Sequence, residues 1–133
     1  MSKVDFTRAQ PVFDRAGNVI AAWAFGSAKE GILRAGGDVD IAVLFDQSPS
    51  LDERVELLIG LQRALGIDEV DLVVLNGASP VTRFEAVSGR LLFSRHIGKQ
   101  AEFVSLAARE YEYAMALYQW GLANRPQTTE SRP

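Results

Sequence analysis

Cysteine is absent from the 133 residues of the chain, and histidine occurs only once. The absence of thiols excludes disulfide frameworks, thiolate zinc sites and cysteine nucleophiles. The single imidazole, His96, has no second histidine or cysteine to act with. We therefore expect His96 to be a surface residue rather than a metal ligand or a general base.

An excess of positive charge is missing as well. Lys and Arg number 14 against 17 Asp and Glu, which gives a formal net charge of −3. A long nucleic acid or an anionic membrane would require clustered basic residues to replace its counterions. We therefore expect neither as a partner, whereas a nucleotide needs only local positive charge.

Long apolar runs are also lacking. None approaches the roughly 20 residues of a membrane span, and the amino terminus lacks the apolar core of a signal peptide. The sequence therefore predicts a cytoplasmic protein, in a compartment that supplies nucleoside triphosphates and magnesium. Its 47% apolar and 23% charged residues are typical of a globular chain. We expect one domain over residues 1–124 and a disordered tail over residues 125–133, which are polar and proline-bearing.

Apolar patterning predicts a mixture of strands and helices. Strands are predicted over residues 19–25, 38–45 and 70–75, with a short edge strand or loop over 89–94. Helices are predicted over residues 7–15, 28–35, 50–65, 81–87 and 98–123. The clearest is the helix over 50–65, which Ser50 or Asp52 can cap and Gly66 ends, with apolar positions at Leu51, Val55, Leu58, Leu61 and Leu65. This mixture favours a small α/β (α+β) fold, a mixed sheet flanked by helices with a long carboxy-terminal helix.

Two aspartates, Asp38 and Asp40, stand at the start of an apolar strand. Residues two apart on a strand share a face, with α-carbons about 6.6 Å apart. Two such carboxylates can converge on one cation or bridge two, and oxygen ligands select hard ions such as magnesium. If the next strand is a neighbour in the sheet, Asp71 at its start becomes a third carboxylate of the same site.

A glycine-serine pair, Gly26 and Ser27, ends the preceding apolar strand. Glycine permits an unusual turn and close approach of a ligand, and Ser27 would offer a hydroxyl and an N–H to phosphate at the start of the predicted helix over 28–35. Plainer interpretations exist for both features. The aspartates could be solvated residues at strand ends, and the pair could simply end a strand and cap a helix.

Together, "GSAKEGILRAGGDVDIAV" and "VDLVVL" resemble the DNA polymerase beta-like nucleotidyltransferase superfamily. The small size is similar to that of the minimal nucleotidyltransferases (MNT), the antitoxins of HEPN/MNT toxin–antitoxin pairs. The resemblance implies that Gly26 and Ser27 hold the triphosphate of ATP. It implies that Asp38, Asp40 and Asp71 bind one or two Mg²⁺ ions and act in catalysis. The implied reaction transfers AMP from ATP to a hydroxyl, a tyrosine of a HEPN-family RNase toxin, and silences the toxin in a hetero-oligomer.

Two other hypotheses stay open. Members of that family often carry arginine and serine at the positions of Ala28 and Gly37, which motivates a non-catalytic antitoxin that occludes its toxin. The missing positive charge could come from Lys29 or Arg34. A small-molecule nucleotidyltransferase of the aminoglycoside type is less favoured, because such enzymes usually carry a substantial further substrate-binding region.

The long carboxy-terminal helix is rich in large apolar and aromatic residues. We expect Trp23 and Trp120 in the core. An apolar stripe is predicted along the helix, made of Phe103, Leu106, Tyr113, Leu117 and Trp120. The aromatic residues of the helix cannot all face one core, so Tyr111 and Tyr118 are candidates for contact with a protein partner.

Overall fold

Strands and helices alternate along the computed structural model, which describes residues 2–125. The strands are β1 (Ser2–Lys3), β2 (Val19–Phe25), β3 (Ile32–Leu33), β4 (Val39–Phe45), β5 (Val70–Val74) and β6 (Arg90–Ser94). The helices are η1 (Phe6–Ala9), a 3-10 turn, α1 (Gln10–Arg15), α2 (Leu51–Leu65), α3 (Pro80–Val87) and α4 (Ile97–Ala123). The predicted α+β fold, with a long carboxy-terminal helix, is confirmed. Of the tail predicted over residues 125–133, all but Arg125 lies outside the described residues.

The main sheet has four strands in the order β5-β4-β2-β6. The β2 strand pairs antiparallel with β4 and with β6, whereas β4 and β5 run parallel. The β6 strand therefore lies at an edge, as the sequence predicts for residues 89–94. Because β4 and β5 are parallel neighbours, the residues at their starts meet at the same end of the sheet.

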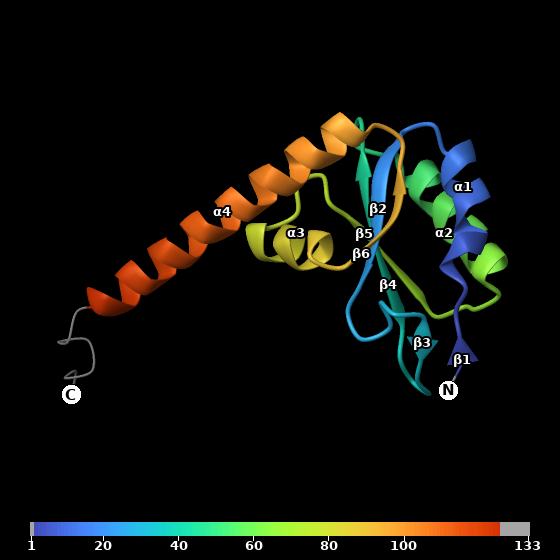
Figure 1. The fold of residues 1–133 in the computed structure, drawn as a ribbon, viewed down its shortest axis with the longest axis horizontal. Helices are drawn as coiled ribbons and strands as arrows, with labels where there is room; N and C mark the ends of the chain where they lie inside the picture. Colours follow the sequence, from blue (N-terminus) through green and yellow to red (C-terminus); the bar gives the residue numbers. More distant parts are fainter. Residues whose placement is uncertain (1, 126–133) are drawn as a thin grey trace.

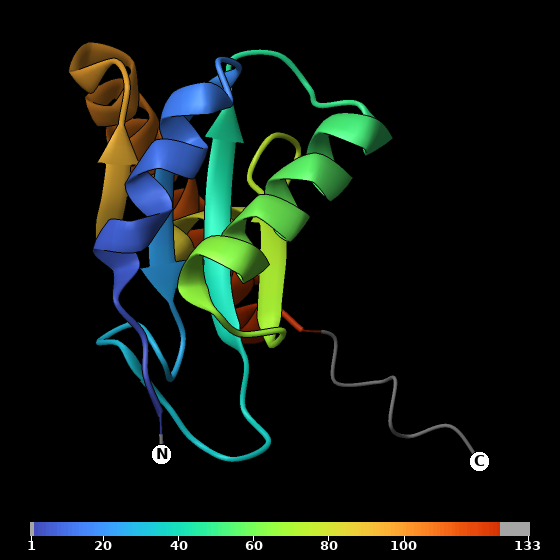
Figure 2. The same cartoon turned by 90° about the vertical axis from the view of Figure 1, so that its right-hand side faces the viewer.

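Helices cover both faces of this sheet (Figures 1 and 2). On one face α1 and α2 enclose a core that includes Phe13, Ile41 and Leu61. On the other face α3 and the first half of α4 enclose a smaller core around Trp23, which is 2% exposed and confirms its predicted burial. Successive side chains of the buried central strands β2 and β4 point alternately to these two faces, so each strand contributes to both cores.

The α2 helix begins and ends where the sequence predicts. The Ser50 hydroxyl accepts a hydrogen bond from the backbone N–H of Glu53, whose carboxylate accepts one from the backbone N–H of Ser50. Gly66 ends the helix in the left-handed conformation. The predicted apolar face is only partly right, because Leu51 and Val55 are exposed in the first turns and the buried residues are Leu57, Leu61 and Leu65.

The predicted helix over residues 28–35 is wrong. This segment forms a turn that leads into β3, which pairs antiparallel with β1. Gly31 adopts a positive φ of 91°, and its carbonyl accepts a hydrogen bond from the backbone N–H of Val4 at 2.7 Å. A pairing partner near the amino terminus therefore replaces the local hydrogen bonds that a helix would need.

The α4 helix packs on the body only through its first half. Phe103 lies against Trp23, with ring centroids 6.2 Å apart, and Tyr111 stacks on Phe84 at 4.2 Å. The second half extends away from the sheet (Figure 1). Trp120 is 67% exposed, so its predicted place in the core is wrong. None of the helices in the described residues is both long enough and apolar enough to span a bilayer.

Candidate active site

The three predicted aspartates lie at one end of the sheet. Asp40 of β4 lies directly opposite Asp71 of β5 in the parallel register, and Asp38 immediately precedes β4. Alternate residues share a face, so all three belong to the face that α3 and α4 cover. The predicted neighbourhood of Asp71 with Asp38 and Asp40 is therefore confirmed, because the two strands are adjacent.

The electrostatics of this cluster are unfavourable for Asp40. Partial burial raises the pKa of its carboxyl, and the negative charges of Asp71, Asp38 and Glu85 raise it further. Glu85 comes from α3, where the sequence predicts no site residue. The packing of α3 beside the sheet brings this fourth acid to the site. No short sequence motif predicts this position of Glu85.

Gly26 lies directly against Asp40. The β2–β4 register pairs Phe25 with Asp40, so the turn after β2 passes the acidic end of the sheet. Gly26 has a φ of 77°, and a methyl group built on its α-carbon would overlap the Asp40 carboxylate oxygen Oδ2. Glycine suits this position for two reasons: it accepts the left-handed conformation, and any side chain here would displace the Asp40 carboxylate.

Ser27 follows Gly26 in an exposed turn. Since residues 28–35 form no helix, the expected partial positive charge of a helix amino terminus is missing at Ser27. The contribution that Ser27 can make is its hydroxyl and the N–H groups of the turn. Ala28 points into the core and is 2% exposed, so its position cannot carry a charged side chain toward this site without rearrangement.

A cleft of about 430 Å³ opens beside the acids. Gly26 and Lys29 line its sheet side, Glu85 and Phe84 its α3 side, and Tyr111 its α4 side. Lys29 thus brings a positive charge to the cleft. Arg34, the other cation considered in the sequence, lines a separate hollow near Ser2. The size and the mixture of aromatic and charged walls suit a nucleotide-sized ligand.

The chemistry of the acidic cluster fits a hard divalent cation. A cation beside Asp40 and Asp71 would relieve the repulsion that raises the Asp40 pKa, and carboxylate oxygen is the ligand that Mg²⁺ prefers. Across residues 2–125, no group of three or more acidic, histidine or cysteine side chains already has the arrangement of a metal site. Binding would therefore require Asp38, Asp40 and Asp71 to turn toward one another.

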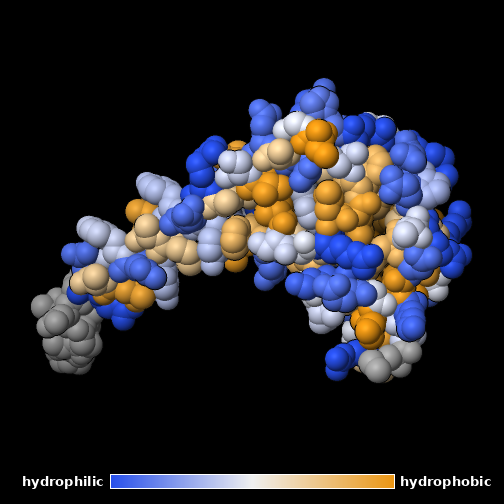
Figure 3. All heavy atoms as spheres, in the orientation of Figure 1, coloured by the Kyte–Doolittle hydropathy of each residue, from blue (hydrophilic) through white to orange (hydrophobic). Residues whose placement is uncertain are grey.

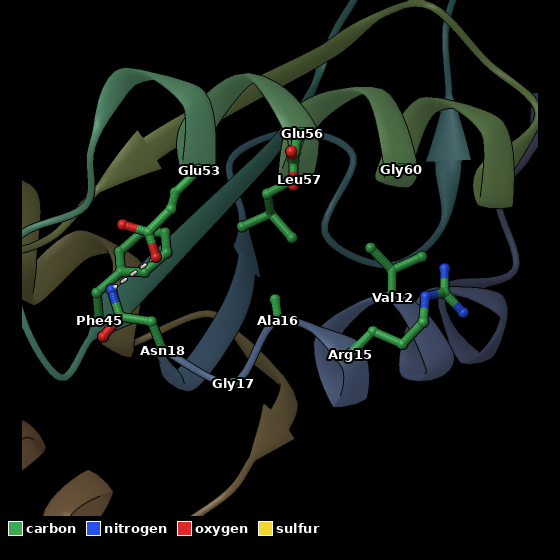
Figure 4. A pocket seen from close by; sticks show the side chains of 10 residues that line it. All are labelled: Val12, Arg15, Ala16, Gly17, Asn18, Phe45, Glu53, Glu56, Leu57 and Gly60. Atoms are coloured by element: carbon green, nitrogen blue, oxygen red, sulfur yellow. Dashed lines mark hydrogen bonds between the residues drawn. The ribbon is translucent and has the colours of Figure 1, made fainter.

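A second hollow, of about 300 Å³, lies between α1 and α2 (Figure 4). In it the Asn18 side-chain amide donates a hydrogen bond to Glu53 at 3.3 Å. Its lining includes Phe45 at the far end of β4, and none of the predicted site residues belongs to it. The hollow is therefore separate from the acidic cluster.

His96 has a structural role. It is exposed and caps the amino terminus of α4, where its Nδ1 accepts a hydrogen bond from the backbone N–H of Lys99 at 3.1 Å. This agrees with the expected surface position. An imidazole engaged at the start of α4 takes no part in the acidic cluster.

The fold and the cluster of acids define a class of protein. A parallel β4–β5 pair that presents Asp40 and Asp71, next to a glycine turn, is the arrangement predicted for a nucleotidyltransferase. The family described as Polymerase beta, Nucleotidyltransferase matches residues 8–97, more than half of the chain. The protein belongs to this family.

Solved structures extend the likeness to antitoxins. A toxin–antitoxin structure with AMP-PNP is 25% identical, with a TM-score of 0.72 over 90% of this chain and 97% of the other. A toxin–antitoxin MntA-HepT structure is 27% identical, with a TM-score of 0.63 over 85% and 88%. An MNT antitoxin from Shewanella oneidensis, in complex with a tri-AMPylated HEPN toxin, is 24% identical, with a TM-score of 0.65 over 90% and 98%. The predicted resemblance to MNT antitoxins is thus confirmed. No curated protein sequence matches the chain.

Proposed function

We propose that this protein is an antitoxin that transfers AMP from ATP to a hydroxyl, expected to be a tyrosine, of a cognate HEPN toxin and thereby neutralises it. The observation that carries the proposal is the position of Asp40 opposite Asp71, with the Gly26 turn against the Asp40 carboxylate. Solved relatives include a structure with AMP-PNP and a complex with a tri-AMPylated toxin, which supports this direction of transfer.

The proposed reaction is a displacement at the α-phosphorus of ATP. The toxin hydroxyl oxygen forms a bond to that phosphorus, the bond from the α-phosphorus to the bridging oxygen breaks, and pyrophosphate leaves with the electron pair. The hydroxyl proton passes to a base, for which Asp71 is the candidate at the acidic end of the sheet. Gly26 and Ser27 hold the triphosphate through the turn, and Lys29 adds positive charge from the cleft wall.

Asp38, Asp40 and Asp71 would hold magnesium in this proposal. Magnesium, when bound, neutralises charge on the reacting phosphate and lowers the pKa of the attacking hydroxyl. A tyrosine hydroxyl, with an ordinary pKa of about 10, needs such help at neutral pH. The chain supplies the position of the carboxylates, which β4 and β5 fix in register.

A label-transfer experiment tests the proposal. The protein is incubated with purified toxin, Mg²⁺ and ATP that carries the label on either the α- or the γ-phosphate. The toxin should gain α-label only, and Asp38→Ala/Asp40→Ala should abolish the gain. Asp14→Asn, an exposed aspartate of α1 beyond the other face of the sheet, is the matched control and should transfer at the wild-type rate. Label transfer by the double variant would refute the proposed site.

A non-catalytic antitoxin is the second candidate. The observations that favour it are the buried Ala28, where relatives of this type often carry arginine, and the carboxylates that do not yet converge. An occluding antitoxin should protect cells equally well after Asp38→Ala/Asp40→Ala. If that variant still binds the toxin but no longer protects cells, occlusion alone is not sufficient to neutralise the toxin.

A further inference from the structure

The second half of α4 carries an unusual surface. Residues 113–124 contain no charged side chain, and they extend beyond the body of the molecule. Tyr113 is 68% exposed, Tyr118 63% and Trp120 67%, and Leu117 and Leu122 are about half exposed. Figure 3 shows apolar residues distributed along this arm. We call residues 113–124 the distal segment of α4.

The distal segment is apolar on two sides. Tyr113, Leu117 and Trp120 form one stripe at helical spacing. Tyr118 lies about 140° around the helix from Tyr113 and starts a second stripe with Leu122. The second stripe continues the side on which Ala107 and Tyr111 pack against the body. Between the two stripes, on the third side, lies the polar Gln119.

The exposed apolar area of the distal segment would supply more than half of one side of a specific interface. Aromatic side chains bury about 150–250 Å² each when fully covered, so the five residues together offer on the order of 500 Å² of surface. Specific interfaces bury about 800 Å² per partner, and the largest apolar patch on a monomer is about 300–600 Å². A helix that is apolar on more than one side is normally enclosed.

We propose that the distal segment of α4 is clasped in an apolar, uncharged groove of the toxin. This inference rests on the proposed function, since the toxin is the partner named there. A second copy of the chain, paired with α4 side by side, would cover only one stripe and leave the other exposed. The two walls of a groove cover both stripes, as in helix-in-groove recognition.

The position of the segment relative to the cleft supports the same partner. Tyr111 lines the cleft together with Gly26 and Lys29, and the distal segment begins two residues later on the same helix. The stack of Tyr111 on Phe84 and an ion pair between Arg83 and Glu110 at 3.2 Å fix α4 to α3. A protein held on the distal segment is therefore held beside the acids, where its hydroxyl must react.

Binding measurements without ATP test the inference independently of catalysis. We compare the full chain with Leu117→Arg in the first stripe and Tyr118→Arg in the second, and measure Kd for the purified toxin by titration calorimetry. Each variant should weaken binding at least about thirtyfold, as expected for central interface residues. Gln119→Arg adds the same charge on the third side and should stay within about threefold of the wild type.

The outcomes separate this inference from the proposed function. If the wild type binds and labels the toxin but Leu117→Arg or Tyr118→Arg binds equally well, the clasp is refuted and the proposed function stands. If the variants lose binding but the wild type never labels the toxin, the proposed function fails and the clasp stands. Thermal unfolding of both variants should match the wild type, because both side chains are exposed. If the free chain forms a dimer and either variant dissociates it, the distal segment binds a second copy of the chain and the proposed contact with the toxin is refuted.

Discussion

At the scale of single residues, the site depends on three neighbouring aspartates whose negative charges repel one another. The sequence predicts this cluster. Asp38 and Asp40 share a face because they are two apart on a strand, and Asp71 joins them because β5 is a parallel neighbour. The fourth acid, Glu85, could not be predicted, because its place depends on how α3 packs. The sequence offers both Lys29 and Arg34 as sources of positive charge, and only the course of the turn after Gly26 decides in favour of Lys29.

The stability of the metal-free protein should depend on Asp40. Its pKa is raised, mainly by burial, above the ordinary value of 3.8, so ionisation of Asp40 opposes folding as the pH rises through the raised pKa. Asp40→Asn should therefore raise the Tm at neutral pH in the presence of a chelator. The gain should shrink as the pH falls and vanish below 3.8, where Asp40 is protonated in the folded and unfolded states alike.

Differential scanning fluorimetry across pH measures this effect. Asp14→Asn, beyond the opposite face of the sheet, should show no such pH-dependent gain. Added Mg²⁺ should raise the Tm of the wild type and leave that of Asp40→Asn nearly unchanged. A Tm for Asp40→Asn equal to or below that of the wild type at neutral pH would contradict the electrostatic description of the cluster.

Gly26 offers a second test at this scale. Gly26→Ala and Gly36→Ala place a side chain at nearly the same left-handed φ, 77° and 79°, with a backbone cost of about 1–2 kcal/mol each. Only the Gly26 methyl meets the Asp40 carboxylate, whereas nothing lies within 4 Å of one at Gly36. Gly26→Ala should thus lower the rate of label transfer at least about tenfold, and Gly36→Ala should leave it near normal. Equal effects on transfer would show that the contact with Asp40 does not matter.

At the scale of elements, local signals predicted those structures that depend on nearby residues. The Ser50–Glu53 capping box and Gly66 fix both ends of α2. The segment 28–35 could not be predicted in this way, because β3 pairs with β1 some thirty residues earlier in the chain. The apolar spacing of α2 also does not show which of its residues are covered, because Leu51 and Val55 are exposed whereas Leu57 is buried.

Arg95 joins two elements that are distant in sequence. Its guanidinium donates hydrogen bonds to the backbone carbonyls of Val19 at 2.9 Å and Phe13 at 2.7 Å, which links β6 to β2 and to the end of α1. Arg95→Ala should lower the free energy of unfolding by about 1.5–3 kcal/mol, the range for hydrogen bonds from charged groups. Arg95→Lys should recover only part of this, because an ammonium group lacks the planar fork. Urea denaturation measures both, and a loss below about 0.5 kcal/mol in Arg95→Ala would contradict a linking role.

At the scale of the whole molecule, the sheet with helices on both faces could be predicted, and the course of α4 could not. The pattern of apolar residues along α4 is compatible with a long buried stripe, yet the body ends near Tyr111 and leaves Tyr113, Leu117 and Trp120 exposed. A single sequence does not show at which residue a long helix such as α4 stops packing against the rest of the molecule. The expected partner contacts of Tyr118 remain a prediction, and Tyr111 instead packs on Phe84 at the cleft.

The intact mass of the toxin after incubation with this protein, ATP and Mg²⁺ tests the central claim most directly. The toxin should gain whole AMP units with the wild-type protein. No gain is expected with Asp40→Asn or Asp71→Asn, two residues that are paired in the parallel register of β4 and β5. A toxin of unchanged mass with the wild type, although it binds and is neutralised, would contradict the claim that the acidic cluster is the active site.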